Sequence, residues 1–353
     1  VRQLMLAGKA QEANELFYQT LNRIQVMPRQ KAAYPGLSGY TNSFQPLGDL
    51  VLELEGLGEA GEYGRALDLR DGVADIQFQG LGGRIRQRCL VPAGEDVIVF
   101  RMEAERPVTG RIRFERAEQP EYRWTAAAGK ELTVQGEFAE GVKSFVQVMA
   151  QADEGGEVAA EGQQLVLQFH AVKGLTIYVA VEAGKGDYDP QSGCRRKIEG
   201  LQDKTYEEIL QRHQAEHRSF MDRAVLVLEK PRENRPTDAE ALLARAGQGE
   251  YPPELAELVF QMGRYLMIAC NRAGRRPANL QGIWNAALVP EWDADWHTDM
   301  NIEMNQWLAN PPNLDECNLA LFRQVERIVE QGRRNGYQEL PDVMQDAQPG
   351  EGE

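Results

Sequence analysis

The residues best suited to chemistry in this chain are gathered between positions 275 and 310, which read RRPANLQGIWNAALVPEWDADWHTDMNIEMNQWLAN. Four of the five tryptophans lie here, interleaved with short amides and carboxylates. A core segment would not carry so many polar side chains, because each buried polar group needs a partner. A solvated loop would not carry so many tryptophans. Flat aromatic faces beside amides and carboxylates suit a sugar, which has apolar C–H faces and a rim of hydroxyl groups.

Asp299 and Asn301 are the sharpest local candidates for catalysis. Side chains two positions apart point the same way in an extended backbone, so both could face one cavity, whereas in a helix they diverge by roughly 200°. The apolar residues Met304 and Trp307 indicate that a helix begins at or just after this point. Asp299 therefore has a second interpretation, as an N-cap or first-turn acid of that helix.

Three further features are open to two interpretations each. His297 is either packed beside tryptophan or a ligand that contacts a sugar hydroxyl, and Trp292 and Trp296 are either stacking platforms or parts of a core. His213 and His217 stand at i and i+4, a spacing that can bind metal, but no third ligand is in sight and packing is favoured. With neither a nucleophile elbow nor a dinucleotide fingerprint present, we expect no metal and no cofactor.

The composition of the chain restricts its partners. Its 353 residues carry a net charge of −15, which argues against nucleic acid and anionic membrane surfaces and fits a neutral ligand. The four cysteines form no metal spacing, so the compartment stays open, as does the oligomeric state. The chain begins at Val1 inside a helical pattern and ends in an acidic tail, so we expect a piece of a longer protein.

Elements that could position the candidate residues follow from hydrophobic periodicity. Residues 1–25 have helical spacing, and residues 50–182 alternate with period two, which predicts a large antiparallel sandwich without intervening helices. The clearest strand runs are 49–55, 74–78, 84–91, 97–102, 110–115, 145–150, 165–169 and 175–181.

The second half of the chain is predicted to be mostly helical. Thr205 with Glu208 makes a capping box, residues 224–228 read as a short strand, and Pro253 sits where a helix starts. Helical segments are also expected at 300–308 and 316–333. We therefore predict a β domain over 1–182, a helical linker over 183–236 and the first helices of another domain over 237–353.

Several motifs of the chain, in order, resemble those of glycoside hydrolase family 95, which consists mainly of α-L-fucosidases with some L-galactosidases. PANLQGIWNAALVPEW followed by HTDMNIEMNQWLAN resembles its catalytic segment, and FQPLGDLVLEL resembles its YQPLGDL strand. The resemblance implies a multidomain β-plus-α architecture: an N-terminal β super-sandwich, a helical linker, and an (α/α)6 barrel with a small β domain after it. This chain would hold a trimmed sandwich, the linker and only the start of the barrel.

The resemblance also implies an activity, the inverting hydrolysis of terminal α-L-fucosides or of a related L-sugar. In that family a glutamic acid protonates the leaving group and an Asn-x-Asn pair holds the attacking water, with about 6.5–9.5 Å between the two sites. The Asn pair falls on Asp299 and Asn301, and the sugar-contacting histidine on His297. We expect Trp284, Asn285, Gln281 and Trp292 to bind the sugar as well.

Two departures from the family pattern affect this expectation. Position 299 is aspartate, and a carboxylate could accept the proton directly where an amide would need help. MNQWLAN replaces the usual MNYWPAE, so Gln306 removes an aromatic ring and Asn310 removes a carboxylate. The family's general acid is expected beyond residue 353, which would leave this chain alone inactive. The alternative hypothesis is a degenerate homologue or a fragment that only binds glycans.

Overall fold

The computed structural model describes residues 4, 7, 9, 11, 12, 44–81, 83–117, 122–128, 131–138, 142–160, 166–228, 238–288, 290–298 and 300–339. The chain divides into two compact units, one made of Val1–Pro46 with Pro277–Trp307 and the other of Leu47–Arg276 with Leu308–Glu353. The helix predicted over 1–25 lies almost entirely outside the described residues. None of the helices that the structure describes combines the length and apolar character needed to cross a membrane.

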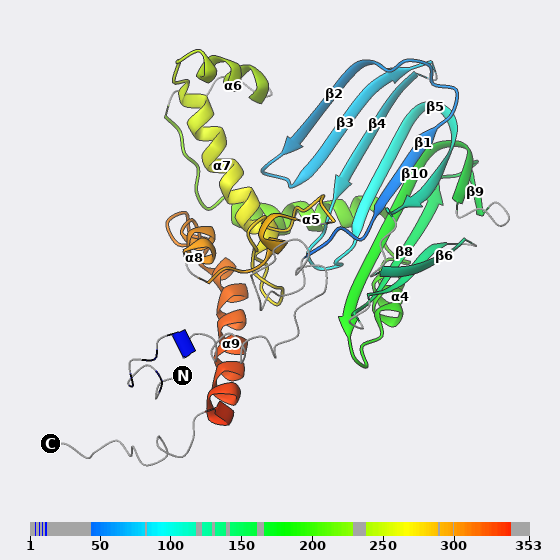
Figure 1. The fold of residues 1–353 in the computed structure, drawn as a ribbon. Coiled ribbons are helices and arrows are strands. Elements are labelled where there is room, and N and C mark those ends of the chain that lie inside the picture. The colour runs from blue at the N-terminus through cyan, green and yellow to red at the C-terminus, as the bar shows by residue number, and fades with distance from the viewer. Residues whose placement is uncertain are drawn as a thin grey trace. The chain divides into compact units, whose positions relative to one another are not determined.

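The larger unit contains one antiparallel sheet, in which the described strands follow the order β2-β3-β4-β5-β10-β8-β7-β6 (Figure 1). Strand β1 also pairs with β5, and β9 pairs with β10. The strands are β1 Asp49–Leu54, β2 Gly61–Asp68, β3 Val73–Gly80, β4 Gly83–Leu90, β5 Ile98–Glu115, β6 Tyr122–Ala128, β7 Leu132–Phe138, β8 Val142–Ala152, β9 Glu157–Ala160 and β10 Val166–Lys185. The predicted antiparallel β region is confirmed.

Two long strands, β5 and β10, lie side by side in the middle of the sheet. The sequence predicted two separate runs for each of them. Their pairing is interrupted by register shifts between Phe169 and Gly174 of β10, opposite the part of β5 that contains Pro107. Proline cannot donate to the ladder and is tolerated at such irregularities. The breaks in the sequence pattern therefore mark bulges within continuous strands.

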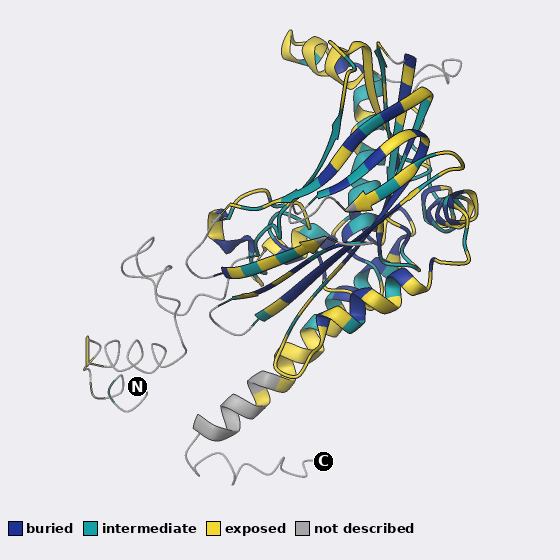
Figure 2. Ribbon diagram, turned by 90° about the vertical axis from the view of Figure 1, so that its right-hand side faces the viewer, coloured by how far each residue is buried: buried dark blue, intermediate teal, exposed yellow. Residues whose placement is uncertain are grey.

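Buried residues alternate with less buried ones along β7, whereas residues 174–180 of β10 are all buried because both faces of the sheet are covered there, with the main core on one face (Figure 2). Ile112, Leu132, Leu167 and Phe169 are fully buried in this main core. Gly110 is required beside Phe169, because a Cβ atom there would lie 2.6 Å from the phenyl Cζ and 2.1 Å from the Glu53 carbonyl oxygen. Four strands, β2, β6, β7 and β9, have no counterpart among the predicted runs. In β2 every residue is exposed, so its sequence gives no alternation.

The helices α4 (Pro190–Glu199) and α5 (Tyr206–Met221) cover part of the opposite face of the sheet. Asp189 caps α4 by accepting from the Gln191 and Ser192 N–H groups. The predicted capping box of α5 is confirmed, with Thr205 Oγ1 accepting from Glu208 N and the Glu208 carboxylate accepting from Thr205 N. These caps satisfy N–H groups that the first turn of a helix leaves unpaired.

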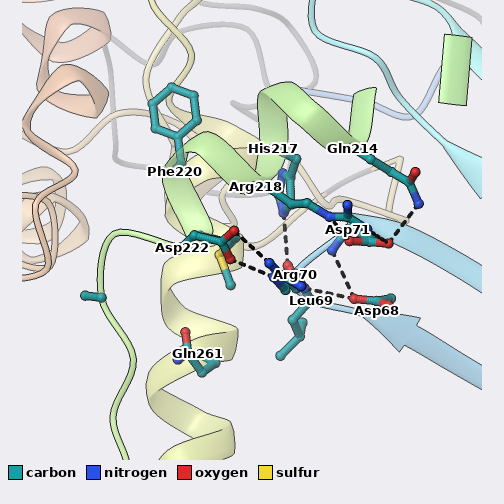
Figure 3. Close-up of polar contacts among 12 residues, drawn as sticks. Asp68, Leu69, Arg70, Asp71, Gln214, His217, Arg218, Phe220, Asp222 and Gln261 are labelled. Carbon is teal, nitrogen blue, oxygen red and sulfur yellow. Dashed lines mark hydrogen bonds and ion pairs between the residues drawn. The ribbon is translucent and has the colours of Figure 1, made fainter. Parts of the chain in front are cut away.

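Helix α5 is fastened to the turn between β2 and β3 by a dense set of polar contacts (Figure 3). Arg218 donates twice to Asp71, at 2.6 and 2.7 Å, and Arg70 donates to Asp222. His217 Nε2 donates to the Leu69 carbonyl oxygen at 3.0 Å. The contacts join segments more than 140 residues apart and fix the linker helix against the sheet.

His213 and His217 have the packing role favoured from the sequence. His213 Nε2 donates to the Gly72 carbonyl oxygen at 3.0 Å, and the two imidazole rings stack with centroids 5.9 Å apart. Gly72, at φ 66°, allows this approach, because a Cβ atom would lie 3.0 Å from His213 Nε2. Burial lowers the pKa of His217 to about 4 and also lowers the pKa of His213. Both histidines are therefore neutral at pH 7.

The remaining helices of the larger unit are α6 (Ala239–Gly247), α7 (Pro253–Cys270), the 3-10 helix η2 (Asp315–Cys317) and α9 (Asn318–Glu339). Helix α7 begins at Pro253, as predicted. Residues 224–228 form no strand, so that prediction is wrong: the Ala224 carbonyl oxygen accepts from Arg264 and the Leu228 N–H donates to Glu257.

Arg264 of α7 is fully buried and joins α7 to the end of α5. Its guanidinium donates to the carbonyl oxygens of Phe220 and Met221, each at 2.9 Å, and to that of Ala224. The last carbonyls of a helix have no partner within the helix and favour a cation. Burial lowers the pKa of Arg264, which shows that desolvation is the main cost of this arrangement.

Candidate active site

The site residues predicted from the sequence all fall in residues 277–307, which belong to the smaller unit together with residues 44–46. Asp299 itself lies outside the described residues. The regular elements of this unit are the 3-10 helix η1 (Glu291–Ala294) and helix α8 (Asn301–Gln306). The site is therefore carried largely by loop backbone, and hydrogen bonds must hold it in place.

A tight turn at Asn279–Gly282 forms the base of the loop. The two residues exchange both backbone hydrogen bonds at 3.0 Å, and Asn279 Oδ1 accepts from Gln281 N at 2.8 Å. Such a side-chain bond to the backbone two residues on is the Asx-turn, for which asparagine is favoured. Asn305 Nδ2 of α8 donates to the Asn279 carbonyl oxygen at 3.0 Å. This bond ties α8 to the turn.

Gln281 presents an unused acceptor in this turn. Its carbonyl oxygen accepts from Trp284 N at 3.1 Å, which places both predicted binding residues in one turn. The Gln281 side-chain oxygen Oε1 is buried and finds no hydrogen-bond partner within the described ranges. A buried acceptor left without a partner costs free energy, so this side-chain arrangement is held at a cost.

Three consecutive residues of η1 have left-handed backbone. The φ angles of Trp292, Asp293 and Ala294 are 53°, 59° and 48°. Each such non-glycine residue costs on the order of 1–3 kcal/mol and persists only where its surroundings hold it. Asp293 is held through its carbonyl oxygen, which accepts from Phe44 N at 3.0 Å. Strain of this kind concentrates at functional sites, and here it sets the direction of the Trp292 side chain.

Trp292 and His297 lie together at the surface of the unit. Their rings meet edge to face with centroids 6.0 Å apart, and Trp292 is 61% exposed. Trp296 is different, because its Nε1 donates to the Pro277 carbonyl oxygen at 2.9 Å and its ring packs on Phe44. Of the two tryptophans whose role was open, Trp296 packs and Trp292 is available to a ligand.

Asn285 is already bonded to the backbone. Its Nδ2 donates to the carbonyl oxygens of Phe44, at 2.7 Å, and Ala287, at 2.9 Å, and its Oδ1 accepts from Ala287 N at 2.9 Å. In this arrangement Asn285 holds the loop against residue 44 and has only one acceptor lone pair to spare.

Asn301 is the first residue of α8 and is exposed. The N-cap position before it is occupied by Met300, at φ 61°, which makes no side-chain capping bond. Ile302 N donates to the His297 carbonyl oxygen at 3.0 Å, which connects the histidine to the first turn of the helix. Within the described residues, no hydrogen bond joins the Asn301 side chain to the other predicted residues, so it remains accessible.

This unit exposes an unusually large amount of aromatic surface. Trp284 is 47% exposed and Trp307 is 62% exposed, beside the exposed Trp292. Exposed aromatic groups of this size mark interaction sites. In the part of the chain that the structure describes, no group of three His, Cys, Asp or Glu side chains could hold a metal ion. The chemistry on offer is hydrogen bonding by amides beside aromatic faces.

Sequence reasoning did not assign a role to Asn279 or Asn305, although both belong to the polar set of this stretch. The Asx-turn signal at Asn279 could have been found, because Asn followed by Gln-Gly is typical of a turn. The bond from Asn305 could not, since it joins residues 26 positions apart.

Two family models match the chain, one on each part. Residues 205–340 match the glycosyl hydrolase family 95 catalytic domain, and residues 1–188 match the glycosyl hydrolase family 65 N-terminal domain. Both matches are to domains of glycosyl hydrolase families, which is the class of protein that the chain resembles. The chain carries the family 65 type of N-terminal domain over more than half of its length, and the part that follows it is similar to the family 95 catalytic domain.

The relatives span considerably more sequence than this chain. Alpha-L-fucosidase 2 from Arabidopsis thaliana is 34% identical over 149 residues, which is 41% of this chain and 18% of that protein. Probable alpha-fucosidase A from Aspergillus oryzae is 24% identical over 310 residues, 82% of this chain and 42% of that protein. A putative kojibiose phosphorylase from human microbiome has a TM-score of 0.45 at 10% identity and covers 67% of this chain and 33% of that one. The predicted (α/α)6 barrel and the division at residues 182 and 236 stay predictions.

Proposed function

We propose that the whole protein is an exo-acting glycosidase that hydrolyses terminal α-L-fucosides, or a close L-sugar such as L-galactose, with inversion. The match of residues 205–340 to a family 95 catalytic domain carries this proposal, because it includes the whole loop from Asn279 to Trp307. Two relatives bear the names alpha-L-fucosidase and probable alpha-fucosidase, which supports fucosides as the substrate class.

In this proposal the loop binds one terminal sugar ring. The unpartnered Gln281 amide turns to accept a hydrogen bond from a ring hydroxyl, and the exposed Trp292 and Trp284 offer faces to the C–H side of the ring. His297, held edge-on by Trp292, contacts a second hydroxyl. Several preorganised donors and acceptors around one ring give both orientation and specificity.

Asp299 and Asn301 would hold the attacking water beneath the ring. The accessible amide of Asn301 at the start of α8 can donate and accept, which suits it to orient a water molecule. The Asp299 carboxylate would accept the proton as the water attacks. Inversion also requires a carboxylic acid on the opposite face at about 6.5–9.5 Å. Because the chain spans less than half of these relatives, the test uses the whole protein.

The first test measures hydrolysis of an aryl α-L-fucoside by the whole protein and variants. Asp299→Ala should lower kcat at least about 10²-fold, the scale of lost acid–base assistance. Glu291→Ala, which removes an exposed carboxylate of the same unit, is the matched control and should leave kcat unchanged. Normal turnover of Asp299→Ala would remove Asp299 from the mechanism.

A second test separates the two possible roles of Asp299. Asp299→Asn restores the amide found in the family, so substantial remaining activity indicates that the residue positions water, whereas loss equal to that of Asp299→Ala indicates proton acceptance. Proton NMR of the first product reports stereochemistry: β-L-fucose must appear before mutarotation, and α-L-fucose first would contradict inversion. Glycan binding without any hydrolysis by the whole protein would favour the non-catalytic alternative.

A further inference from the structure

A polar hollow lies on the β-sheet domain and is lined only by residues of the larger unit. It has a volume of about 530 Å³, and its floor is the face of β6, β7 and β8 that helix α4 leaves uncovered. The turn that leads from β10 into α4, residues 187–191, forms one wall. Hollows of roughly 300–1,000 Å³ are the size of small-molecule sites.

Two cross-strand rows make up the floor. Arg123 of β6 is opposite Glu137 of β7, which is opposite Lys143 of β8. In the next row Gln135 is paired with Thr125 on one side and Phe145 on the other. Alternate residues of a strand point to the same face, so all these side chains project from one side of the sheet. The floor therefore offers charged, amide, hydroxyl and aromatic groups within one patch.

The polar groups of the floor are not used by the fold. The side chains of Arg123, Gln135 and Glu137 are exposed. Counting only residues that the structure describes, these side chains make no hydrogen bond or ion pair. Lys143 reaches only the Gly186 carbonyl oxygen, at 3.4 Å. Arg123 and Glu137 are cross-strand neighbours of opposite charge but do not pair with each other, so a ligand could reach both by displacing water alone.

The wall presents a rigid aromatic ring. Tyr188 is 40% exposed, and its hydroxyl donates to Glu182 at 2.6 Å. Its ring lies directly on Gly184, where a Cβ atom would come within 2.2 Å of the ring carbon Cδ1. Asp189 holds the same turn by capping α4. A ring fixed in this way loses little side-chain entropy when a ligand binds against it.

We propose that this hollow binds a neutral oligosaccharide. Its lining carries two cationic side chains and three carboxylates, a near balance that disfavours phosphate, sulfate and other strongly charged ligands. Amides, charged groups of both signs and a fixed tyrosine ring are the partners that hydroxyl groups and C–H faces require. The site would hold a glycan chain on the β-sheet domain, and it does not depend on the proposed hydrolytic activity.

Isothermal titration of the whole protein with fucose-free probes tests the proposal. The probes are cellotetraose, xylotetraose, mannotetraose and maltotetraose. At least one probe should bind with a Kd in the millimolar range or below. The double variant Arg123→Ala and Gln135→Ala should weaken that binding at least about tenfold, the value of one or two hydrogen bonds. The control pair Arg65→Ala with Gln77→Ala removes the same residue types from β2 and β3, outside the hollow, and should change nothing.

Three results would overturn the proposal: no heat with any probe up to about 10 mM, binding that the Arg123 and Gln135 variants leave intact, or equal loss in the control pair. Preference for inorganic sulfate over every oligosaccharide would also overturn it. Hydrolysis of an aryl fucoside is measured in parallel and should be equal in all variants. Failure of this proposal is thus separate from failure of the proposed activity.

Discussion

Replacing Arg264 tests how the linker helix is attached to the first long helix of the catalytic region. The guanidinium is fully buried and donates to three main-chain carbonyls, those of Phe220, Met221 and Ala224. A hydrogen bond to a charged group contributes about 1.5–3 kcal/mol, and an acceptor left buried without a partner costs about 1–3 kcal/mol. Relief of guanidinium desolvation offsets part of the loss.

For Arg264→Ala we expect a loss of about 4 kcal/mol in the free energy of unfolding, since the substitution also leaves a cavity. Arg264→Lys keeps the charge but replaces the planar fork by a single ammonium, which cannot serve the same carbonyls at once, so the loss should be about half as large. Arg245→Ala is the control: its exposed ion pair with Glu250 should contribute less than about 1 kcal/mol.

Urea unfolding followed by far-UV circular dichroism measures these values, with the midpoint compared at constant slope. Hydrogen exchange of the amides in α5 and α7 shows whether the loss is localised to this junction. If Arg264→Ala were no less stable than Arg245→Ala, the guanidinium would not hold the two helices together, and the argument from burial would be refuted.

Other parts of the chain give further predictions. His217, whose folded-state pKa is lowered to about 4 by burial, should protonate more readily when unfolded, so the free energy of unfolding falls as the pH drops below about 6.5, by about 2 kcal/mol at pH 5. His217→Gln should flatten the pH dependence of the urea midpoint between pH 7 and 5; an unchanged slope would contradict the cause. Asn285→Ala should cost about 1–3 kcal/mol and increase exchange of the Ala287 amide. Asn310→Ala removes one exposed hydrogen bond, from Asn318, so it should cost less than about 1 kcal/mol and leave that exchange unchanged. Gly110→Ala should destabilise by at least about 2 kcal/mol in thermal melts, since its Cβ would meet backbone, whereas Gly94→Ala has open space and should not.

The strands and helices could be predicted where a local signal exists. Alternation over 84–91 and 145–150 predicted β4 and β8, and the Thr205–Glu208 capping box predicted the start of α5. These signals act within a few residues, through the period of the backbone and the bonding of helix ends. β2 could not be found in this way, because all its residues are exposed and only its pairing with β3 makes it a strand.

The candidate site shows the same division. The mixture of tryptophans, amides and carboxylates in 275–310 predicted, from the sequence alone, where a sugar-binding loop would lie and which residues it would use. Which tryptophan packs and which is exposed was decided by the tertiary structure, because Trp296 finds Phe44 and the Pro277 carbonyl while Trp292 does not. The free acceptor on Gln281, the bonded amide of Asn285 and the unused polar floor beside α4 were likewise set by which distant groups meet them. A residue's chemistry is present in its sequence, but its availability depends on whether folding brings it a partner.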